Sequence, residues 1–163
     1  WIRTLAEPSG KGTPYVNTNA NEHEGQFSPD GRWIAYRSKE TGRHEIYVRP
    51  FPNVDNGKWQ ITTNGGNAPV WAPNGHELFY LNGDSMMVVP IETEPTLTYA
   101  APRRLFSGSY SATDVRNFDI SADGQRFLMI KDAEATVDPS MRDEITVVIN
   151  WSEELKRLRP TRN

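Results

Sequence analysis

Short apolar segments alternate with turn-forming residues along most of the chain, and one version of this pattern occurs three times. It lies at residues 26–36, again at 70–80, and a third time at 119–129. Each copy has an extended apolar step, a small residue, an Asp-Gly or Asn-Gly pair and a second apolar run. Such runs, bounded by such pairs, are typical of two β-strands joined by a tight turn. The pattern therefore predicts three β-hairpins.

The same turn chemistry is expected in all three copies. A two-residue hairpin loop favours positive φ at both central residues, and Asp or Asn followed by Gly tolerates this best. Pro29 and Pro73 precede the pair, where a fixed φ costs no ladder hydrogen bond. Gly31, Gly75 and Gly124 are 44 and 49 residues apart. A period of roughly 40–50 residues indicates the four-stranded blades of a β-propeller.

The apolar runs between the hairpins complete these blades. The expected strands are 25–28, 33–37, 45–49 and 58–62, then 69–72, 77–81, 86–91 and 103–106, then 118–121, 126–131 and 144–150. Residues 1–24, with strands at 1–5 and 14–18, are expected to be the outer strands of a preceding blade. The predicted blades are 25–64, 65–108 and 117–151, the last without its fourth strand, followed by a short helix at 152–159.

The expected fold is therefore all-β. It is a single partial β-propeller domain over residues 1–163, with about three four-stranded antiparallel blades, half of a six-bladed ring, and a short C-terminal helix. Aromatic residues at equivalent repeat positions are expected to pack between the blades. They are Trp33, Tyr36, Trp71, Phe79, Tyr80 and Phe127.

Composition restricts the possible functions. The net charge of −3 gives no sign of the concentrated basic face that nucleic acid requires. No apolar run approaches the roughly 20 residues of a membrane span, so membrane insertion is not expected. The lack of cysteine excludes disulfides and thiol catalysis.

No catalytic, metal or cofactor site is predicted. His23, His44 and His76 do not lie at metal-ligand spacing. Asp30, Asp119 and Asp123 could suggest calcium, but Asp30 and Asp123 are more simply turn residues, and no segment has the density of oxygen ligands that a calcium loop needs. A serine nucleophile elbow needs Gly-x-Ser-x-Gly, whereas residues 108–112 have Tyr at the centre and no closing Gly.

The binding residues are predicted from their position in a propeller. Function in this architecture is usually carried by loops on one rim and by the mouth of the channel. The connections that lead into the inner strands are therefore the candidates, with a protein or peptide as the expected ligand. They contain Asn21, His23, Glu24, Asn67, Arg116 and Asn117.

The repeats resemble a known family, the TolB-type (WD40-like, PD40) β-propeller repeat. The residues that carry this resemblance are 27–31, 33–36, Ser38, Gly42 and 45–48. A narrower set is similar to the C-terminal propeller of many bacterial serine/threonine kinases: Arg49-Pro50-Phe51-Pro52, Gly65-Gly66, 77–80, 123–128 and 150–155. Asn74 in place of Asp, and Ala122 in place of proline, depart from the pattern but keep the turn chemistry.

The resemblance implies a six-bladed ring that docks other proteins rather than catalysing a reaction. It also implies a bacterial protein in the periplasm or elsewhere outside the cytoplasm. We therefore expect a non-catalytic module for protein or peptide binding, the sensory or docking part of a larger protein. The alternative is the accessory propeller of a prolyl-oligopeptidase-type serine peptidase whose catalytic domain is absent from this sequence.

Three blades leave two apolar faces unpaired, and two ways of covering them stay open. Further blades can come from a longer protein. Alternatively, a homodimer can complete the six-bladed ring, with the Tyr15 strand of each copy added to the third blade of the other.

Overall fold

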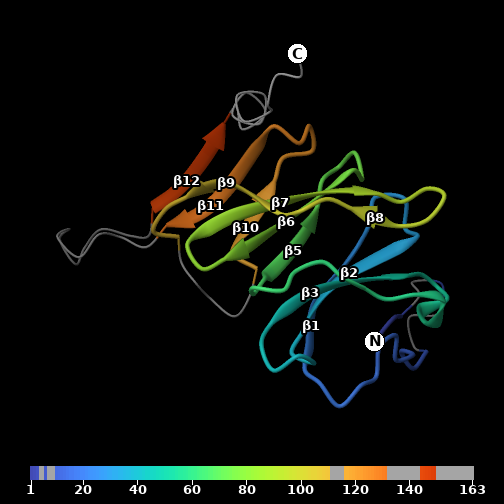
Figure 1. The fold of residues 1–163 in the computed structure, drawn as a ribbon. Coiled ribbons are helices and arrows are strands. Elements are labelled where there is room, and N and C mark those ends of the chain that lie inside the picture. Colours follow the sequence, from blue (N-terminus) through green and yellow to red (C-terminus); the bar gives the residue numbers. More distant parts are fainter. Residues whose placement is uncertain (4–5, 7–9, 111–115, 132–143, 150–163) are drawn as a thin grey trace.

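The computed structural model describes residues 1–3, 6, 10–110, 116–131 and, by backbone alone, 144–149. The described chain forms antiparallel sheets (Figure 1). We call them blades 1, 2 and 3, in chain order. Blade 1 contains β1 (Glu22–Phe27), β2 (Trp33–Ser38), β3 (Glu45–Pro50) and β4 (Trp59–Gln60), in that spatial order, with a short 3₁₀ helix, η1 (Val54–Asn56).

Blades 2 and 3 repeat this order. Blade 2 contains β5 (Asn67–Trp71), β6 (Glu77–Asn82) and β7 (Ser85–Glu92), with β8 (Thr98–Tyr99) and β9 (Arg103–Ser107) both paired to β7. Blade 3 contains β10 (Phe118–Ile120), β11 (Arg126–Lys131) and β12 (Glu144–Ile149). The predicted all-β blades are therefore confirmed. The short strand β8 was not predicted, and the expected helix at 152–159 lies outside the described residues.

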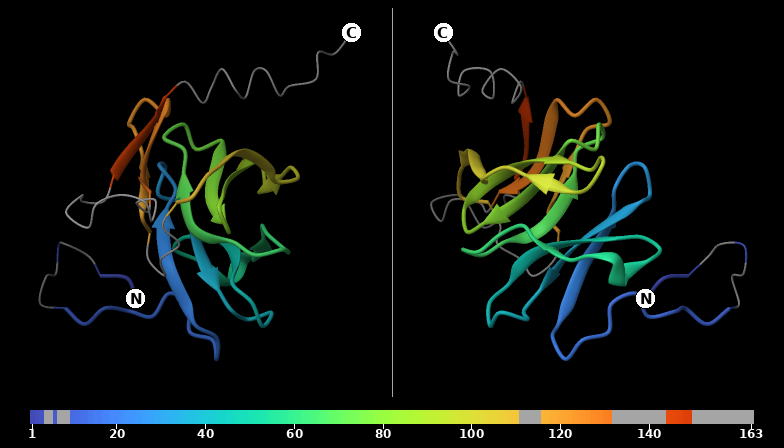
Figure 2. Two further views of the ribbon diagram at one scale, coloured as in Figure 1. Left: turned by 90° about the vertical axis from the view of Figure 1, so that its left-hand side faces the viewer. Right: turned by 45° about the vertical axis from the view of Figure 1, so that its right-hand side comes forward.

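The expected strand at 14–18 is wrong. The described part of the N-terminal segment contains an isolated bridge in which Ile2 and Thr13 exchange two backbone hydrogen bonds of 2.8 Å. Residues 14–18 belong to no strand, because a strand needs a neighbouring strand with which to pair. Figure 2 shows this segment as a loop beside β1. Tyr15 holds it there, since its hydroxyl donates a hydrogen bond to the Pro50 carbonyl at 2.7 Å.

The three predicted turns share one geometry, but it differs from the expected two-residue loop. In the first, the Gly31 N–H donates to the Ser28 carbonyl at 2.9 Å, and the Ser28 N–H donates to the Trp33 carbonyl at 2.8 Å. The other two turns have the same pair of bonds around Ala72 and Ser121. Four residues therefore separate the paired strand ends at each corner.

The prediction of positive φ at both central residues is wrong for these corners. Gly31 has φ of 71°, whereas Asp30 is not among the residues with positive φ. The reason is that Pro29 suits the second position of a type I turn formed by residues 28–31. In this turn Asp30 keeps a negative φ, and only Gly31 lies in the left-handed region. The Asp30 carboxylate then accepts a hydrogen bond from the Arg32 N–H at 3.1 Å.

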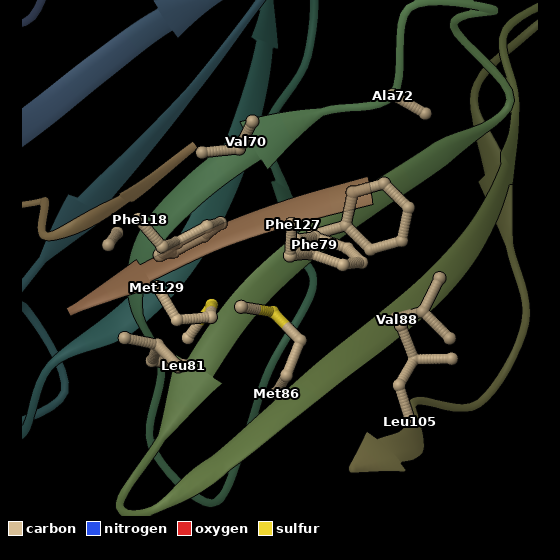
Figure 3. Close-up of a cluster of buried hydrophobic side chains, with 11 residues drawn as sticks. Val70, Ala72, Phe79, Leu81, Met86, Val88, Leu105, Phe118, Phe127 and Met129 are labelled. Atoms are coloured by element: carbon tan, nitrogen blue, oxygen red, sulfur yellow. The ribbon is translucent and has the colours of Figure 1, made fainter. Parts of the chain in front are cut away.

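Two apolar clusters join the blades. The first lies between blades 1 and 2, where Trp71, Leu78 and Tyr80 of blade 2 pack against Ala35 and Ile46 of blade 1. The second lies between blades 2 and 3 (Figure 3). At its centre the rings of Phe79 and Phe127 meet edge to face with centroids 5.0 Å apart. The predicted aromatic packing between blades is thus confirmed at these positions.

Candidate functional site

The candidate site is the end of the inner strands β1, β5 and β10 at which the chain enters each blade, which we call the inner-strand rim. His23, Asn67 and Arg116 occupy the same repeat position there, because they are 44 and 49 residues apart, as are the corner glycines. All three are polar. His23 and Arg116 are exposed, and Asn67 is half-buried. The rim therefore presents a hydrogen-bonding side chain from every blade.

The backbone is distorted at the next residue of the first two blades. Glu24 has φ of 57° and Ala68 has φ of 51°, in the left-handed region that non-glycine residues seldom adopt. The pairing register shifts at both places, between His23 and Gln26 and between Asn67 and Val70. Such bulges re-aim side chains and are common beside functional sites. They also let β1 and β5 begin earlier than the sequence predicted.

A buried polar network connects the rim of blade 1 to that of blade 2. The Arg37 guanidinium lies with its Nε 3.3 Å from Glu24 Oε2, and it donates through Nη1 to Asn67 Oδ1 at 3.0 Å. Glu24 Oε2 also accepts the Ala68 N–H at 2.9 Å. Two residues further along β1, Gln26 Oε1 accepts the Trp71 N–H at 2.8 Å. The side chains of Glu24 and Asn67 therefore hold the two blades in register.

The other predicted residues lie at the same ends of the strands. Asn21 is exposed, and its carbonyl accepts the Lys39 N–H at 3.3 Å. Asn117 is buried, and its carbonyl accepts the Ile130 N–H at 3.3 Å. His23, Asn21 and Arg116 are thus the predicted residues whose side chains are exposed, whereas Glu24 and Asn67 meet through Arg37.

Sequence reasoning missed Arg37 and Gln26. Arg37 lies on a strand that is otherwise apolar, at the repeat position occupied by Leu81 and Ile130 in the other blades. A single charge at a position that is apolar in both other copies was a signal for a buried ion pair. Glu24, the matching acid, stands where blade 2 has Ala68.

A hollow of about 590 Å³ lies beside β1, and it too was not predicted. Its lining includes the side chains or backbone of Trp1, Tyr15, His23, Phe27, Ile34 and Tyr36. Burial raises the pKa of Tyr15 to about 12, with Tyr36 adding to the effect and the charge of Arg49 opposing it. The Tyr15 ring also lies 5.9 Å from that of Phe51. The hollow is therefore an aromatic surface on the open side of blade 1.

In the part of the chain that the structure describes, no three His, Cys, Asp or Glu residues gather as metal ligands would. His76 Nδ1 lies 3.5 Å from Glu92 Oε2, at the end of the blade opposite to the rim. Among the described helices, none is long and apolar enough to cross a membrane.

The sequence matches no family model and no curated protein. The structure is similar to that of a TolB protein from Agrobacterium tumefaciens, with a TM-score of 0.56 and 15% identity over 83% of this chain and 47% of that one. It is also similar to oligogalacturonate lyase from Vibrio parahaemolyticus, with a TM-score of 0.55 and 14% identity over 71% of this chain and 31% of that one.

These likenesses establish the fold alone. The chain has the β-propeller architecture found in TolB and related propellers. It spans less than half the length of either neighbour.

Proposed function

We propose that the chain is a non-catalytic TolB-like propeller module whose inner-strand rim binds a protein or peptide. One observation carries this proposal: the equivalent rim position holds an imidazole, an amide and a guanidinium on the three blades, namely His23, Asn67 and Arg116. Asn67 Oδ1 already accepts a hydrogen bond from Arg37, so the exposed groups of His23 and Arg116 are the ones that can donate and accept hydrogen bonds to a peptide chain. The bulges beside two of them support a functional role.

The likeness to the propellers of bacterial serine/threonine kinases supports a finer proposal. Arg49-Pro50-Phe51-Pro52 and residues 150–155 carry it. On this view the module is the sensory or docking part of a larger bacterial protein, and it works outside the cytoplasm. A ligand bound at the rim would then report on the surroundings of the cell.

A phage-displayed peptide library tests the rim directly. Peptides selected on the chain are expected to lose about tenfold or more in affinity for the double variant His23→Ala with Arg116→Ala, because hydrogen bonds to a charged group contribute roughly 1.5–3 kcal/mol. The matched control is His76→Ala with Arg126→Ala, which removes the same two residue types at the opposite end of the inner strands. Selected peptides that bind all three proteins equally would contradict the rim as the site. A library that yields no binders would contradict the proposed function.

The proposed lack of catalysis has its own test. Peptide p-nitroanilides incubated with the chain should release no nitroaniline above the buffer rate. Turnover that copurifies with the chain would show that it is an enzyme.

A further inference from the structure

Phe27 and Leu128 are exposed on the two outer faces, whereas the residues at the same repeat positions inside the described chain are buried. Phe27 is 43% exposed, whereas Trp71, which lies 44 residues later, is 3% exposed. Leu128 is 46% exposed, whereas Phe79, which lies 49 residues earlier, is fully buried. These spacings equal those of the corner glycines, so the two residues of each pair occupy the same repeat position. One residue of the pair has a neighbouring blade beside it, and the other does not.

The open face of blade 1 is built like the face that blade 2 turns toward blade 1. Phe27, Ile34 and Tyr36 line the hollow, and their equivalents 44 residues on are Trp71, Leu78 and Tyr80. Those three pack in the cluster between blades 1 and 2. Ile34 and Tyr36 are buried, and Trp1 and Tyr15 line the same hollow, so Phe27 is the exposed member of the three. This face of blade 1 therefore has the kind of residues that contact a preceding blade.

The open face of blade 3 is built like the face that blade 2 turns toward blade 3. Burial alternates along β11: Phe127 and Met129 are buried in the cluster shared with blade 2, whereas Leu128 and Ile130 are exposed. The equivalents of the two exposed residues are Phe79 and Leu81, which cover blade 3 inside the chain. Blade 3 therefore presents the residues that contact a following blade.

We infer that the Leu128 face of one copy of this chain packs on the Phe27 face of a second copy, head to tail. The Leu128 face resembles the face of blade 2 that packs on blade 3. The Phe27 face resembles the face of blade 2 that packs on blade 1. Two copies related by a two-fold axis form two identical contacts of this kind and close the array. Together they supply about six blades, within the range of about four to eight found in closed propellers.

The N-terminal segment gives a further reason to place a second copy on these faces. Tyr15 lies 44 residues before Trp59 of the outermost strand β4, so residues 14–18 correspond to the outermost strand of a preceding blade. In the dimer this segment lies beside blade 3 of the second copy, where the described sheet has three strands.

Native mass at increasing concentration tests the inference. Light scattering coupled to gel filtration is expected to give about twice the 18.5 kDa of one chain. Phe27→Asp and Leu128→Asp should each weaken the dimer by about tenfold or more, because burying one large apolar side chain stabilises by roughly 1.5–3 kcal/mol. The control is Tyr99→Asp, which changes an aromatic residue with 42% exposure on β8, away from both faces.

Mixing the variants tests the head-to-tail arrangement. Each single variant has Asp in both contacts of its dimer and should be monomeric at a concentration at which the wild type is dimeric. An equimolar mixture should form a dimer weaker than the wild type, because a mixed pair keeps one contact in which the Phe27 face and the Leu128 face are both intact. Far-ultraviolet circular dichroism checks that each variant is folded.

Three results would overturn the inference. One is a monomeric wild type up to about 100 µM, a concentration at which mass action reveals micromolar association. Another is a dimer insensitive to both substitutions. The third is a dimer of the Phe27→Asp or Leu128→Asp variant alone, which indicates pairing of like faces.

Discussion

The two contacts between blades are built from different chemistry at equivalent positions. At the contact between blades 1 and 2, Arg37 pairs with Glu24 of its own blade and donates across the boundary to Asn67 of blade 2. Between blades 2 and 3, the position of Arg37 is taken by Leu81, and the contact there is an apolar cluster. Apolar burial gives stability without direction, whereas a buried ion pair demands one geometry. Both contacts have an apolar cluster that supplies stability, and the polar network adds a fixed geometry to the contact between blades 1 and 2.

The largest effect is expected from the apolar contact. Phe127→Ala should lower the free energy of unfolding by about 3–5 kcal/mol, because it empties the centre of the cluster where Phe79 and Phe127 meet. Urea denaturation followed by fluorescence measures it. Tyr99→Ala, at an exposed aromatic residue, should cost only about 1 kcal/mol. Equal costs at the two positions would contradict the view that this cluster contributes strongly to stability.

A smaller effect is expected from the polar contact. Arg37→Leu introduces the residue that blade 2 has at this position, and it should cost about 3 kcal/mol because the Glu24 carboxylate stays buried without its cation. Adding Glu24→Ala introduces the residue that blade 2 has at the equivalent position, Ala68. This second substitution should recover part of the lost stability, because no carboxylate is then left buried without its cation. Urea denaturation of the wild type, both single variants and the double variant gives the coupling energy. A double variant that costs the sum of the two singles would show that the pair is not coupled.

The smallest effect is expected from acid at the corners, which lie beside both contacts. Burial alone raises the pKa of Asp30, but hydrogen bonds from Ser28 and Arg32 outweigh it, so this pKa lies below its ordinary value. Hydrogen bonds from Ser121 and the Gln125 N–H likewise lower the pKa of Asp123. A depressed carboxyl pKa stabilises the fold above the unfolded-state pKa of about 3.9, and this stability is lost as the pH falls through the folded value.

Blade 2 offers the control for this prediction, since Asn74 already stands where the other corners have Asp. The double variant Asp30→Asn with Asp123→Asn should lose less melting temperature than the wild type between about pH 5 and pH 2, where such carboxylates take up protons. Thermal unfolding followed by circular dichroism measures the difference. An identical acid profile for the two proteins would mean that these hydrogen bonds do not stabilise the corners.

The sequence predicted the blades well because their signals are local. The corner glycines and the apolar runs beside them lie within about ten residues, and the strands β2, β6 and β11 begin at the predicted residues. The four-residue corner was missed because the contribution of Pro29 to a type I turn competes with the Asp-Gly preference for tighter loops. The predicted strand at 14–18 is wrong because an apolar local pattern predicts a strand without showing whether a neighbouring strand is present to pair with it.

The site was predicted less completely than the fold. Position in the repeat was enough to find His23 and Arg116, whose side chains are exposed. The network of Glu24, Arg37 and Asn67 joins residues up to 43 positions apart, and pairing at such a distance is not visible in a local pattern. The assignment of ligand contacts to the rim stays a prediction.

The corners also determine where the molecule can change in length. A side chain at Gly75 would meet Pro29, and one at Gly124 would meet Pro73, so successive corners lie close together. An inserted residue there would displace one corner from the next. The loops at the opposite ends of the same strands differ in length. The loop after β2 contains residues 39–44, whereas the loop after β6 contains only residues 83–84. New recognition loops can therefore be added on the side of the rim while the blades keep their spacing.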